Sequence, residues 1–282
     1  MRAVVAAVLL ALSGGADPPG AGGPAPPADA RGAHAKLRAA GDLAFQQRDD
    51  PARLVEAIAA YREAARLPGD DAGALLALAR AEAFRARAAP GDAREAWHEA
   101  SSAAERALRV LAPPFAEAVA RGEDPSRAAA RVEAPAAEAL YWLALATMGG
   151  AQARGMAAAL AVKDAARAMM ERAAALDERV DFGGPRRALG AWLATLPSAA
   201  GGGAARAREQ LDRARTLAPA YQLTDVVDAR VLAVLLQDRA RFDALLARVL
   251  AFDDASAPEM GPENRLAKAQ ARALVARRDR LF

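Results

Sequence analysis

Three stretches of the chain repeat one spacing of small and large apolar residues, which we call the apolar ladder. In the clearest copy, Ala207, Leu211, Ala214 and Leu217 follow one another at intervals of three or four residues, and Pro219 ends the run. This spacing places the four side chains on one face of a helix. Alanine lets a neighbouring helix approach closely, and the larger residues fill the space beside it. Proline ends the helix because it lacks an amide hydrogen. The ladder therefore predicts tightly paired helices.

The order of residues in this ladder resembles the second helix of a tetratricopeptide repeat. The separations between copies are not multiples of one period, so we expect a degenerate repeat with insertions. Stacked helix pairs of this kind bury a common seam and present a concave face. We expect residues 34–282 to form one all-α, tetratricopeptide-like domain, in which hairpins stack into a single right-handed helical repeat. The two other copies of the ladder are Ala57, Tyr61, Ala64 and Leu67, and Ala166, Met170, Ala173 and Leu176.

Composition supports an all-α fold and argues against several classes of function. Ala, Leu and Arg are strong helix formers, and β-branched residues are scarce. The 38 basic and 35 acidic side chains give a net charge of +3, and Arg alternates with Asp and Glu at helical spacing. We therefore expect a solvated, salt-bridged surface and no nucleic-acid partner. The chain has no Cys and two His, which excludes thiolate and histidine-rich metal sites. We expect no metal and no other cofactor.

The first 33 residues are expected to serve export rather than folding. Residues 1–16 have the shape of a secretory signal, because an Arg is followed by an apolar run and then by small residues. A mis-assigned start or a buried helix is the alternative interpretation. Gly15 stands where a lipoprotein signal would have its Cys, so we expect a periplasmic protein without a lipid anchor, either released or held by an uncleaved segment. Residues 17–33 are rich in Pro, Gly and Ala and are expected to form a disordered tether.

Turn residues divide the rest of the chain into helices. Residues 115–131 should form short helical pieces broken around Gly122 and Pro125. The helix that starts at Pro135 is apolar on most of its faces, so it should be the central buried helix, ending at Gly149-Gly150. The other helices are expected at residues 34–48, 51–67, 71–88, 90–111, 156–176, 223–236, 239–252 and 263–282, with a helical hairpin at 181–219.

The sequence shows no recognisable catalytic pattern. HExxH and Gly-x-Ser-x-Gly are absent, and Gly201-Gly202-Gly203 lacks the Lys and Ser/Thr of a phosphate loop, so we expect a turn there. His98 is expected at the surface or at a helix seam. The adjacent carboxylates at 49–50, 70–71 and 253–254 are expected to cap helices. We expect no catalytic residues and no enzyme activity. The alternative is a hydrolase with an unrecognised carboxylate pair that includes Glu138 or Asp177.

Five residues are candidates for a groove that binds a ligand or a partner protein. Tyr141 and Trp142 either line the floor of a hydrophobic groove between repeats or pack in the core. Asn264, the only Asn in the chain, either marks a helix start or holds the chain in a set turn through its side-chain amide. Arg186 and Trp192 complete the candidate set.

A series of short motifs runs in order through the second half of the chain, and residues 34–111 add a weaker match. The series resembles the TRAP transporter T-component (TatT) family. Two positions depart from the family pattern: Gly15 replaces the lipoprotein Cys, and Gly203 replaces an acidic cap. The motifs are Leu140-Tyr141-Trp142-Leu143-Ala144, Leu176-Asp177, Gly183-Gly184-Pro185-Arg186, Leu189-Gly190, Leu196-Pro197, Gly201-Gly202, the ladder that ends at Pro219, Pro262-Glu263-Asn264 and Asp279-Arg280-Leu281-Phe282.

This resemblance implies a non-enzymatic accessory protein of a tripartite ATP-independent periplasmic transporter, working beside its solute-binding P component. It also implies a ring-like homotrimer, whose clefts and central pore could pass a hydrophobic or organic-acid ligand. A general periplasmic tetratricopeptide-like scaffold for protein–protein interactions, with no link to a transporter, is the alternative.

Overall fold

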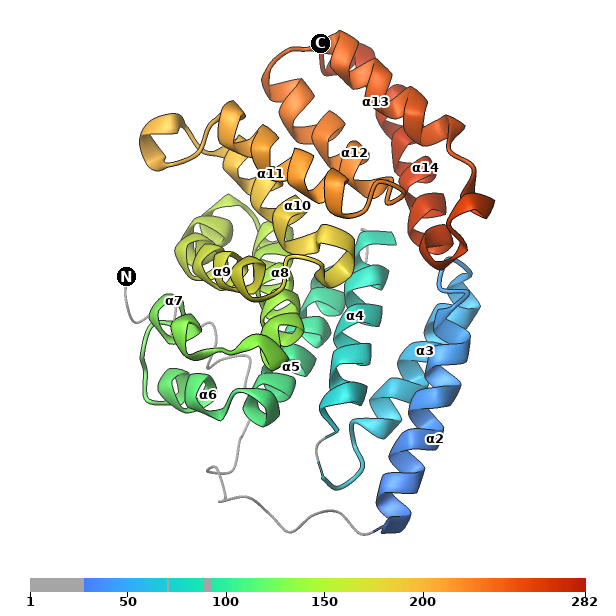
Figure 1. Ribbon diagram of the computed structural model, residues 1–282, viewed down its shortest axis with the longest axis vertical. Helices are drawn as coiled ribbons and strands as arrows, with labels where there is room; N and C mark the ends of the chain where they lie inside the picture. Colours follow the sequence, from blue (N-terminus) through green and yellow to red (C-terminus); the bar gives the residue numbers. More distant parts are fainter. Residues whose placement is uncertain (1–27, 70, 89–92) are drawn as a thin grey trace. The chain divides into compact units, whose positions relative to one another are not determined.

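The computed structural model describes residues 28–69, 71–88 and 93–282, and over these ranges the chain is helical without any β-strand (Figure 1). The all-α prediction is confirmed. The helices group into two compact units that divide between Asp177 and Glu178. The predicted signal segment, and the predicted tether up to residue 27, lie outside the described residues. Helix α2 begins at Ala28 rather than at the predicted His34, so the last part of the predicted tether is helical.

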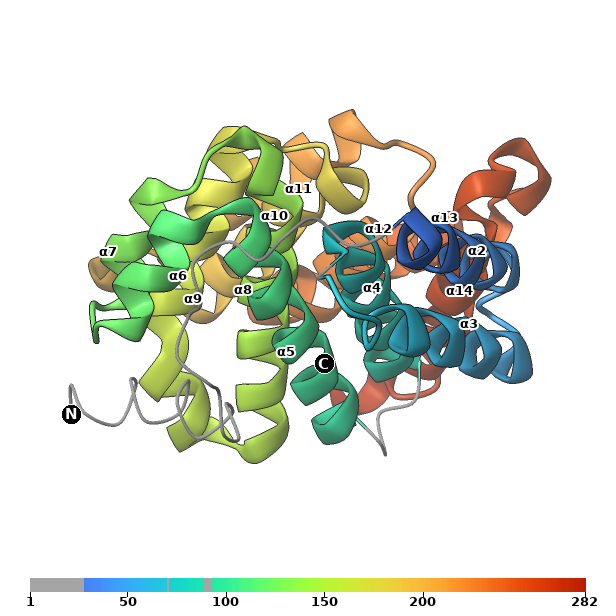
Figure 2. The ribbon, with the colours of Figure 1, turned by 90° about the horizontal axis from the view of Figure 1, so that it is seen from below.

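The first unit is built from antiparallel helix pairs. Helix α2 packs on α3, α4 packs on α5, and α8 packs on both α5 and α9 (Figures 1 and 2). Short pieces interrupt the series where Gly122 and Pro125 were predicted to break it. The helices are α2 (Ala28–Phe45), α3 (Pro51–Ala64), α4 (Ala72–Ala88), α5 (Ala93–Leu111), α6 (Pro113–Ala120), α7 (Pro125–Ala128), α8 (Ala137–Arg154) and α9 (Met156–Leu176), with 3₁₀ turns at Ala129–Arg131 and Ala134–Ala136.

Aspartates begin several of these elements, as their positions predicted. The Asp50 carboxylate accepts a hydrogen bond from the amide of Ala52 at 2.9 Å, just before α3. Asp71 accepts one from the Gly73 amide at 2.8 Å, at the start of α4. Each carboxylate satisfies an amide that has no partner within the helix. These side chains are therefore caps and not members of an acid pair.

Helix α8 does not end at Gly149-Gly150 as predicted but continues to Arg154. A Cβ atom at Gly149 would lie 2.5 Å from the Cε2 atom of Trp97 on α5. The glycine is thus required by the close approach of the indole to the α8 backbone, and not by a turn. The helix ends instead at Gly155, whose φ of 114° is unfavourable for other residues.

The apolar ladders lie at helix–helix contacts. In each copy the first three residues are buried, and the last is half-buried. Gly190 on α10 faces Leu211 on α11 so closely that a Cβ atom would lie 2.6 Å from the leucine Cγ. This is the small-against-large contact that the ladder predicts. Stacking of these pairs into a right-handed tetratricopeptide-like superhelix stays a prediction.

The second unit contains the α10–α11 hairpin, followed by helices that pack around α12 and α14. The predicted helix 223–236 is broken, because α12 passes into a π-helical segment after Asp228. The predicted helix 263–282 ends early at Val275, and the chain turns so that the Phe282 ring packs edge-on against Phe242 at 5.2 Å. The elements are α10 (Val180–Thr195), α11 (Ala204–Leu217), α12 (Leu223–Asp228), the π segment Ala229–Ala233, α13 (Arg239–Ala251) and α14 (Gly261–Val275), with 3₁₀ turns at Ser198–Ala200, Asp254–Ser256, Pro258–Met260 and Arg278–Arg280.

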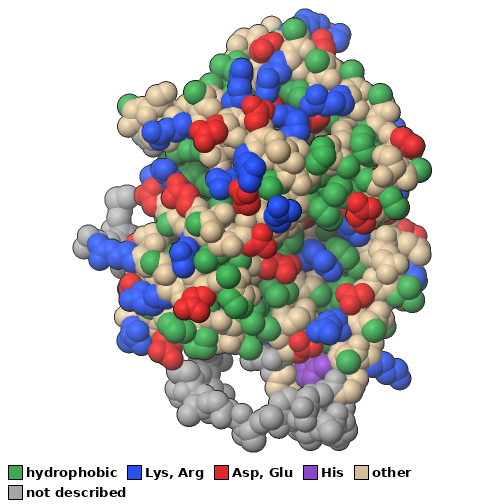
Figure 3. Space-filling model, in the orientation of Figure 1, with side chains coloured by type: hydrophobic (Ala, Val, Ile, Leu, Met, Phe, Trp, Pro, Cys, Tyr) green, Lys and Arg blue, Asp and Glu red, His purple; other side chains and the backbone are tan. Residues whose placement is uncertain are grey.

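Charged side chains of both signs are interspersed over the face seen in Figure 3. Some charged side chains of the protein form ion pairs within one helix, such as Arg167 with Glu171 four residues on, at 2.7 Å. Such exposed pairs each contribute well under 1 kcal/mol. The pattern agrees with the predicted salt-bridged surface.

Candidate functional site

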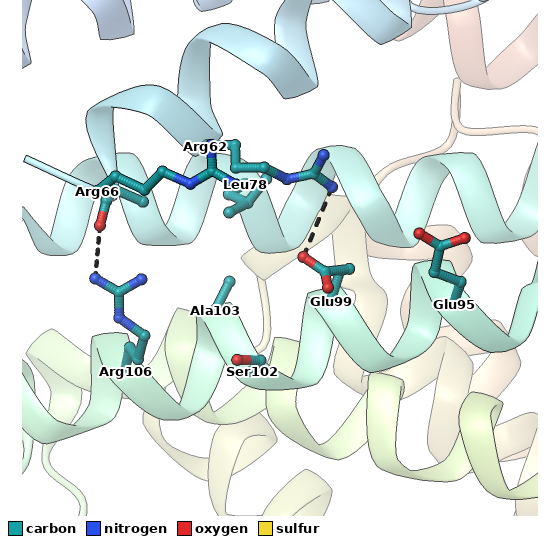
Figure 4. A pocket seen from close by; sticks show the side chains of 9 residues that line it. Arg62, Arg66, Leu78, Glu95, Glu99, Ser102, Ala103 and Arg106 are labelled. Atoms are coloured by element: carbon teal, nitrogen blue, oxygen red, sulfur yellow. Dashed lines mark hydrogen bonds and ion pairs between the residues drawn. The ribbon is translucent and has the colours of Figure 1, made fainter. Parts of the chain in front are cut away.

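A polar pocket of about 330 Å³ lies in the first unit, between the C-terminal end of α3, the middle of α4 and one face of α5 (Figure 4). Its apolar floor consists of Ala65, Leu78 and Ala103, all of which are buried. Around this floor stand three arginines and two glutamates. The pocket therefore combines a small apolar base with charged walls, and it is more polar than most small-molecule sites, in which a few polar groups fix the orientation of the ligand.

Helix geometry places the charges on the α5 wall in a fixed order. Glu95, Glu99, Ser102 and Arg106 recur every three or four residues, so they share one face of the helix. Figure 4 shows the two carboxylates at one end of this face and Arg106 at the other. The Arg106 guanidinium donates to the carbonyl oxygen of Ala65 at 2.6 Å. The backbone after α3 thereby fixes its position at the pocket rim.

Arg62 is neutralised by acidic neighbours. Its Nη2 atom donates to Glu82 at 2.9 Å and lies 3.6 Å from Glu99. Glu82 is fully buried and also accepts from Arg85 at 2.7 Å. Burial raises the pKa of Glu82 above its ordinary value, against the opposing effect of Arg85 and Arg62. The arrangement is a structural ion-pair cluster that leaves little free charge on Arg62.

Arg66 and Glu95 differ from the other charged residues of the pocket. Both are exposed, and within the described residues neither side chain takes part in a hydrogen bond or an ion pair. They belong to opposite ends of the pocket, Arg66 to the end of α3 and Glu95 to the first turn of α5. Their full charges are therefore available to a ligand.

The five residues proposed from the sequence are not brought together around this pocket. Tyr141 and Trp142 lie on α8 and are each 1% exposed, with ring centroids 4.7 Å apart. The Trp142 indole donates to Glu138 at 3.0 Å. This burial favours the core-packing alternative, and Glu138, named above as a possible catalytic acid, instead accepts the indole hydrogen bond.

Arg186, Trp192 and Asn264 lie in the second unit. Arg186 donates to Glu178 at 2.9 Å and to Gln210 at 3.1 Å, so it joins α10 to α11. Trp192 is half-buried on α10. The contacts of Arg186 are internal to this unit and give it a structural role.

Asn264 is fully buried and holds a turn, as one of its two interpretations proposed. Its amide nitrogen donates to the Ala220 carbonyl at 3.0 Å, and its amide oxygen accepts from the Gln222 backbone at 3.0 Å. The amide thus satisfies backbone groups on both sides of Tyr221, where α11 ends and α12 has not begun. A side chain that both donates and accepts is required here, which explains an Asn.

Comparison with known families identifies the chain. The profile of the TRAP transporter T-component family matches residues 43–282, which is most of the sequence. The chain belongs to the TRAP transporter T-component family. No curated protein matches it in sequence. The resemblance proposed from the ordered motifs is confirmed, and the match extends upstream of them to residue 43.

This T-component has no described helix that is both long and apolar enough to cross a bilayer. Within the same residues, no group of three or more His, Asp or Glu is arranged to hold a metal ion.

The T-component also contains a left-handed turn that the sequence did not reveal. Asp181, Phe182 and Gly183 have φ values of 48°, 55° and 79°. Left-handed backbone costs about 1–3 kcal/mol at each of the two non-glycine positions. Arg187 offsets this cost. Its guanidinium donates to the backbone carbonyls of Asp181 and Phe182, each at 3.1 Å, and to the Asp181 carboxylate at 2.8 Å. The same guanidinium lies over the Tyr221 ring, 4.4 Å from its centroid.

A second feature missed from the sequence is a buried carboxylate network. Asp225 and Asp228 on α12 are 4% and 0% exposed. Arg215 bridges them with bonds of 2.8 and 2.9 Å, Arg241 donates twice to Asp228, and Arg248 donates to Asp225 at 2.6 Å. The signal available in the sequence was two acids three residues apart in a short helix whose other residues are apolar except for Thr224. The ion pairs of these two aspartates join α11, α12 and α13.

Proposed function

We propose that this T-component is a non-enzymatic, periplasmic accessory component of a TRAP-type solute transporter and binds the solute-binding P component. The observation that carries the proposal is the family match over residues 43–282. The family consists of transporter accessory components and not of enzymes. The proposal includes a homotrimer, and a hydrophobic or organic-acid ligand held in a groove or pore.

An apolar face at the start of α9 supports a role in protein binding. Met156 and Leu160 are 75% and 56% exposed and lie one helical turn apart, beside the exposed Ala157 and Ala161. Exposed apolar residues are ordinary when scattered singly, whereas neighbours on one face are typical of contact surfaces. We assign this face to the P component.

The test is capture of partners from a native envelope extract by the immobilised full-length chain. The expected result is recovery of an extracytoplasmic solute-binding protein. Recovery of no such protein would contradict the transporter role and favour the general scaffold. Native mass spectrometry of the purified chain would report the oligomer and any retained small molecule in one measurement, and a monomer would contradict the proposed trimer.

The double variant Met156→Asp/Leu160→Glu tests the assigned surface. Both replacements suit the first turns of a helix, so the fold should persist. We expect the variant to lose capture, because two carboxylates would replace the apolar contact. Val110→Glu is the matched control, since Val110 is 41% exposed on α5. If the double variant still captured the solute-binding protein, the assignment of this surface would be wrong, but the proposal that the chain binds the P component would remain supported.

A further inference from the structure

The polar pocket of the first unit is electrically polarised along α5. At one end, Arg66 has no partner among the described residues and Arg106 lies beside it at the pocket rim. At the other end, Glu95 likewise has no side-chain partner in the described part of the chain, and Glu99 lies one turn further along. Arg62, between them, is neutralised by Glu82 and Glu99 and adds little to either end.

We infer that this pocket binds a small linear zwitterion, with its carboxylate at Arg66 and Arg106 and its ammonium group at Glu95 and Glu99. Guanidinium groups recognise carboxylates through paired hydrogen bonds, and an ammonium group donates to carboxylates as a point charge. The chain between the two charged ends lies over the apolar floor defined above. This inference rests on the proposed function for its biological setting, because a T-component is expected to handle a transported solute.

The separation of the charges selects elongated ligands. Glu99 and Arg106 are seven residues apart, which is about 10 Å along a helix that rises 1.5 Å per residue. An α-amino acid is too short to touch both ends, whereas an ω-amino acid spans most of the distance and the flexible side chains close the remainder.

The sign of the charges excludes two simpler ligand classes as the preferred occupants. A dicarboxylate of the same length would place its second negative charge beside Glu95 and Glu99, where like charges repel. A monocarboxylate would satisfy the arginine end and leave Glu95 unpaired. The zwitterion is the one class that complements both ends.

Three six-carbon probes test the inference by isothermal titration of the purified full-length chain: 6-aminohexanoate, hexanoate and adipate. We expect 6-aminohexanoate to bind about fivefold more tightly than either of the others, the upper end for an exposed ion pair. Equal binding of the three probes, or no binding of 6-aminohexanoate, would overturn the inference.

Two single variants assign the ends, and both positions are exposed and without partners in the described residues, so the fold should persist. Arg66→Gln should weaken 6-aminohexanoate binding about fivefold. Glu95→Gln should bring hexanoate and 6-aminohexanoate close to equal affinity, because the remaining carboxylate, Glu99, already pairs with Arg62 and offers the ammonium little charge. Arg121→Gln, at an exposed position directly after α6, is the control and should change nothing. Unchanged affinity in Arg66→Gln would overturn the inference. Because the titration uses the purified chain alone, failure here is distinct from failure of partner capture.

Discussion

The free energy of unfolding of this protein should fall as the pH rises from 5 to 8, and replacing Glu105 by Gln should remove most of that fall. Glu105 lies on α5, and its Oε1 atom is inaccessible to solvent and has no hydrogen-bond partner in the described part of the chain. Burial raises the pKa of this carboxyl from 4.5 to about 7, and Arg109 opposes the rise only in part. Between these two values the folded chain binds more protons than the unfolded chain. The free energy of unfolding therefore falls as the pH rises through this window.

The magnitude follows from the shift. At about 1.4 kcal/mol per pKa unit, the rise costs the folded protein about 3 kcal/mol when Glu105 is ionised, of which about 2.5 kcal/mol appears between pH 5 and pH 8. Gln has nearly the same shape and no charge. Glu105→Gln should therefore be about 3 kcal/mol more stable than the parent chain at pH 8, with a much smaller difference at pH 5.

Urea unfolding followed by circular dichroism at pH 5 and pH 8 measures these differences. Glu117→Gln is the matched control, because Glu117 is an exposed carboxylate on α6 and its loss should leave the pH dependence unchanged. If Glu105→Gln kept the full pH dependence of the parent chain, the carboxyl could not be titrating near pH 7 in the folded protein, and the reasoning would be refuted.

Four further substitutions, the last of them a contrast to the third, are tested by urea or thermal unfolding. Asp228→Ala should cost about 3 kcal/mol, because it leaves partly buried arginines without their shared carboxylate; a cost below 1 kcal/mol would contradict the network. Asn264→Ala should cost about 2 kcal/mol, since two buried backbone groups lose their partners, and an unchanged melting temperature would contradict this. Gly149→Ala should destabilise by about 1–3 kcal/mol through collision with Trp97, whereas Gly32→Ala, a helical position with open space around it, should stabilise by up to about 1 kcal/mol.

Local signals in the sequence predicted the helices well because they depend on neighbouring residues. The aspartate caps before α3 and α4, the breaks at Gly122 and Pro125, and the buried faces of the ladders all follow from short-range geometry. Gly149 is a position whose role neighbouring residues could not predict. A glycine pair is compatible with a turn or with close packing, and only Trp97, far away in the sequence, decides between them.

The candidate pocket could not be predicted, because its charges come from segments that are adjacent only after folding. Arg66 follows α3, while Glu95 and Arg106 are on α5. Each is an ordinary surface residue in the sequence, and only the folded chain shows that Arg66 has no partner among the described residues. Trp142 shows the opposite case, since its prominence in the sequence reflects packing rather than an exposed site.

The left-handed turn at Asp181–Gly183 constrains the order in which this chain can accumulate substitutions. Loss of Arg187 removes the hydrogen bonds that hold two non-glycine residues in an unfavourable backbone conformation. The same loss costs less once Phe182 has been replaced by glycine, because glycine adopts the left-handed region without that cost and the replacement leaves the Arg187–Asp181 ion pair in place. The effect of changing Arg187 therefore depends on the residue present at 182, and of the two possible orders of substitution the one that begins with glycine at 182 is the less costly.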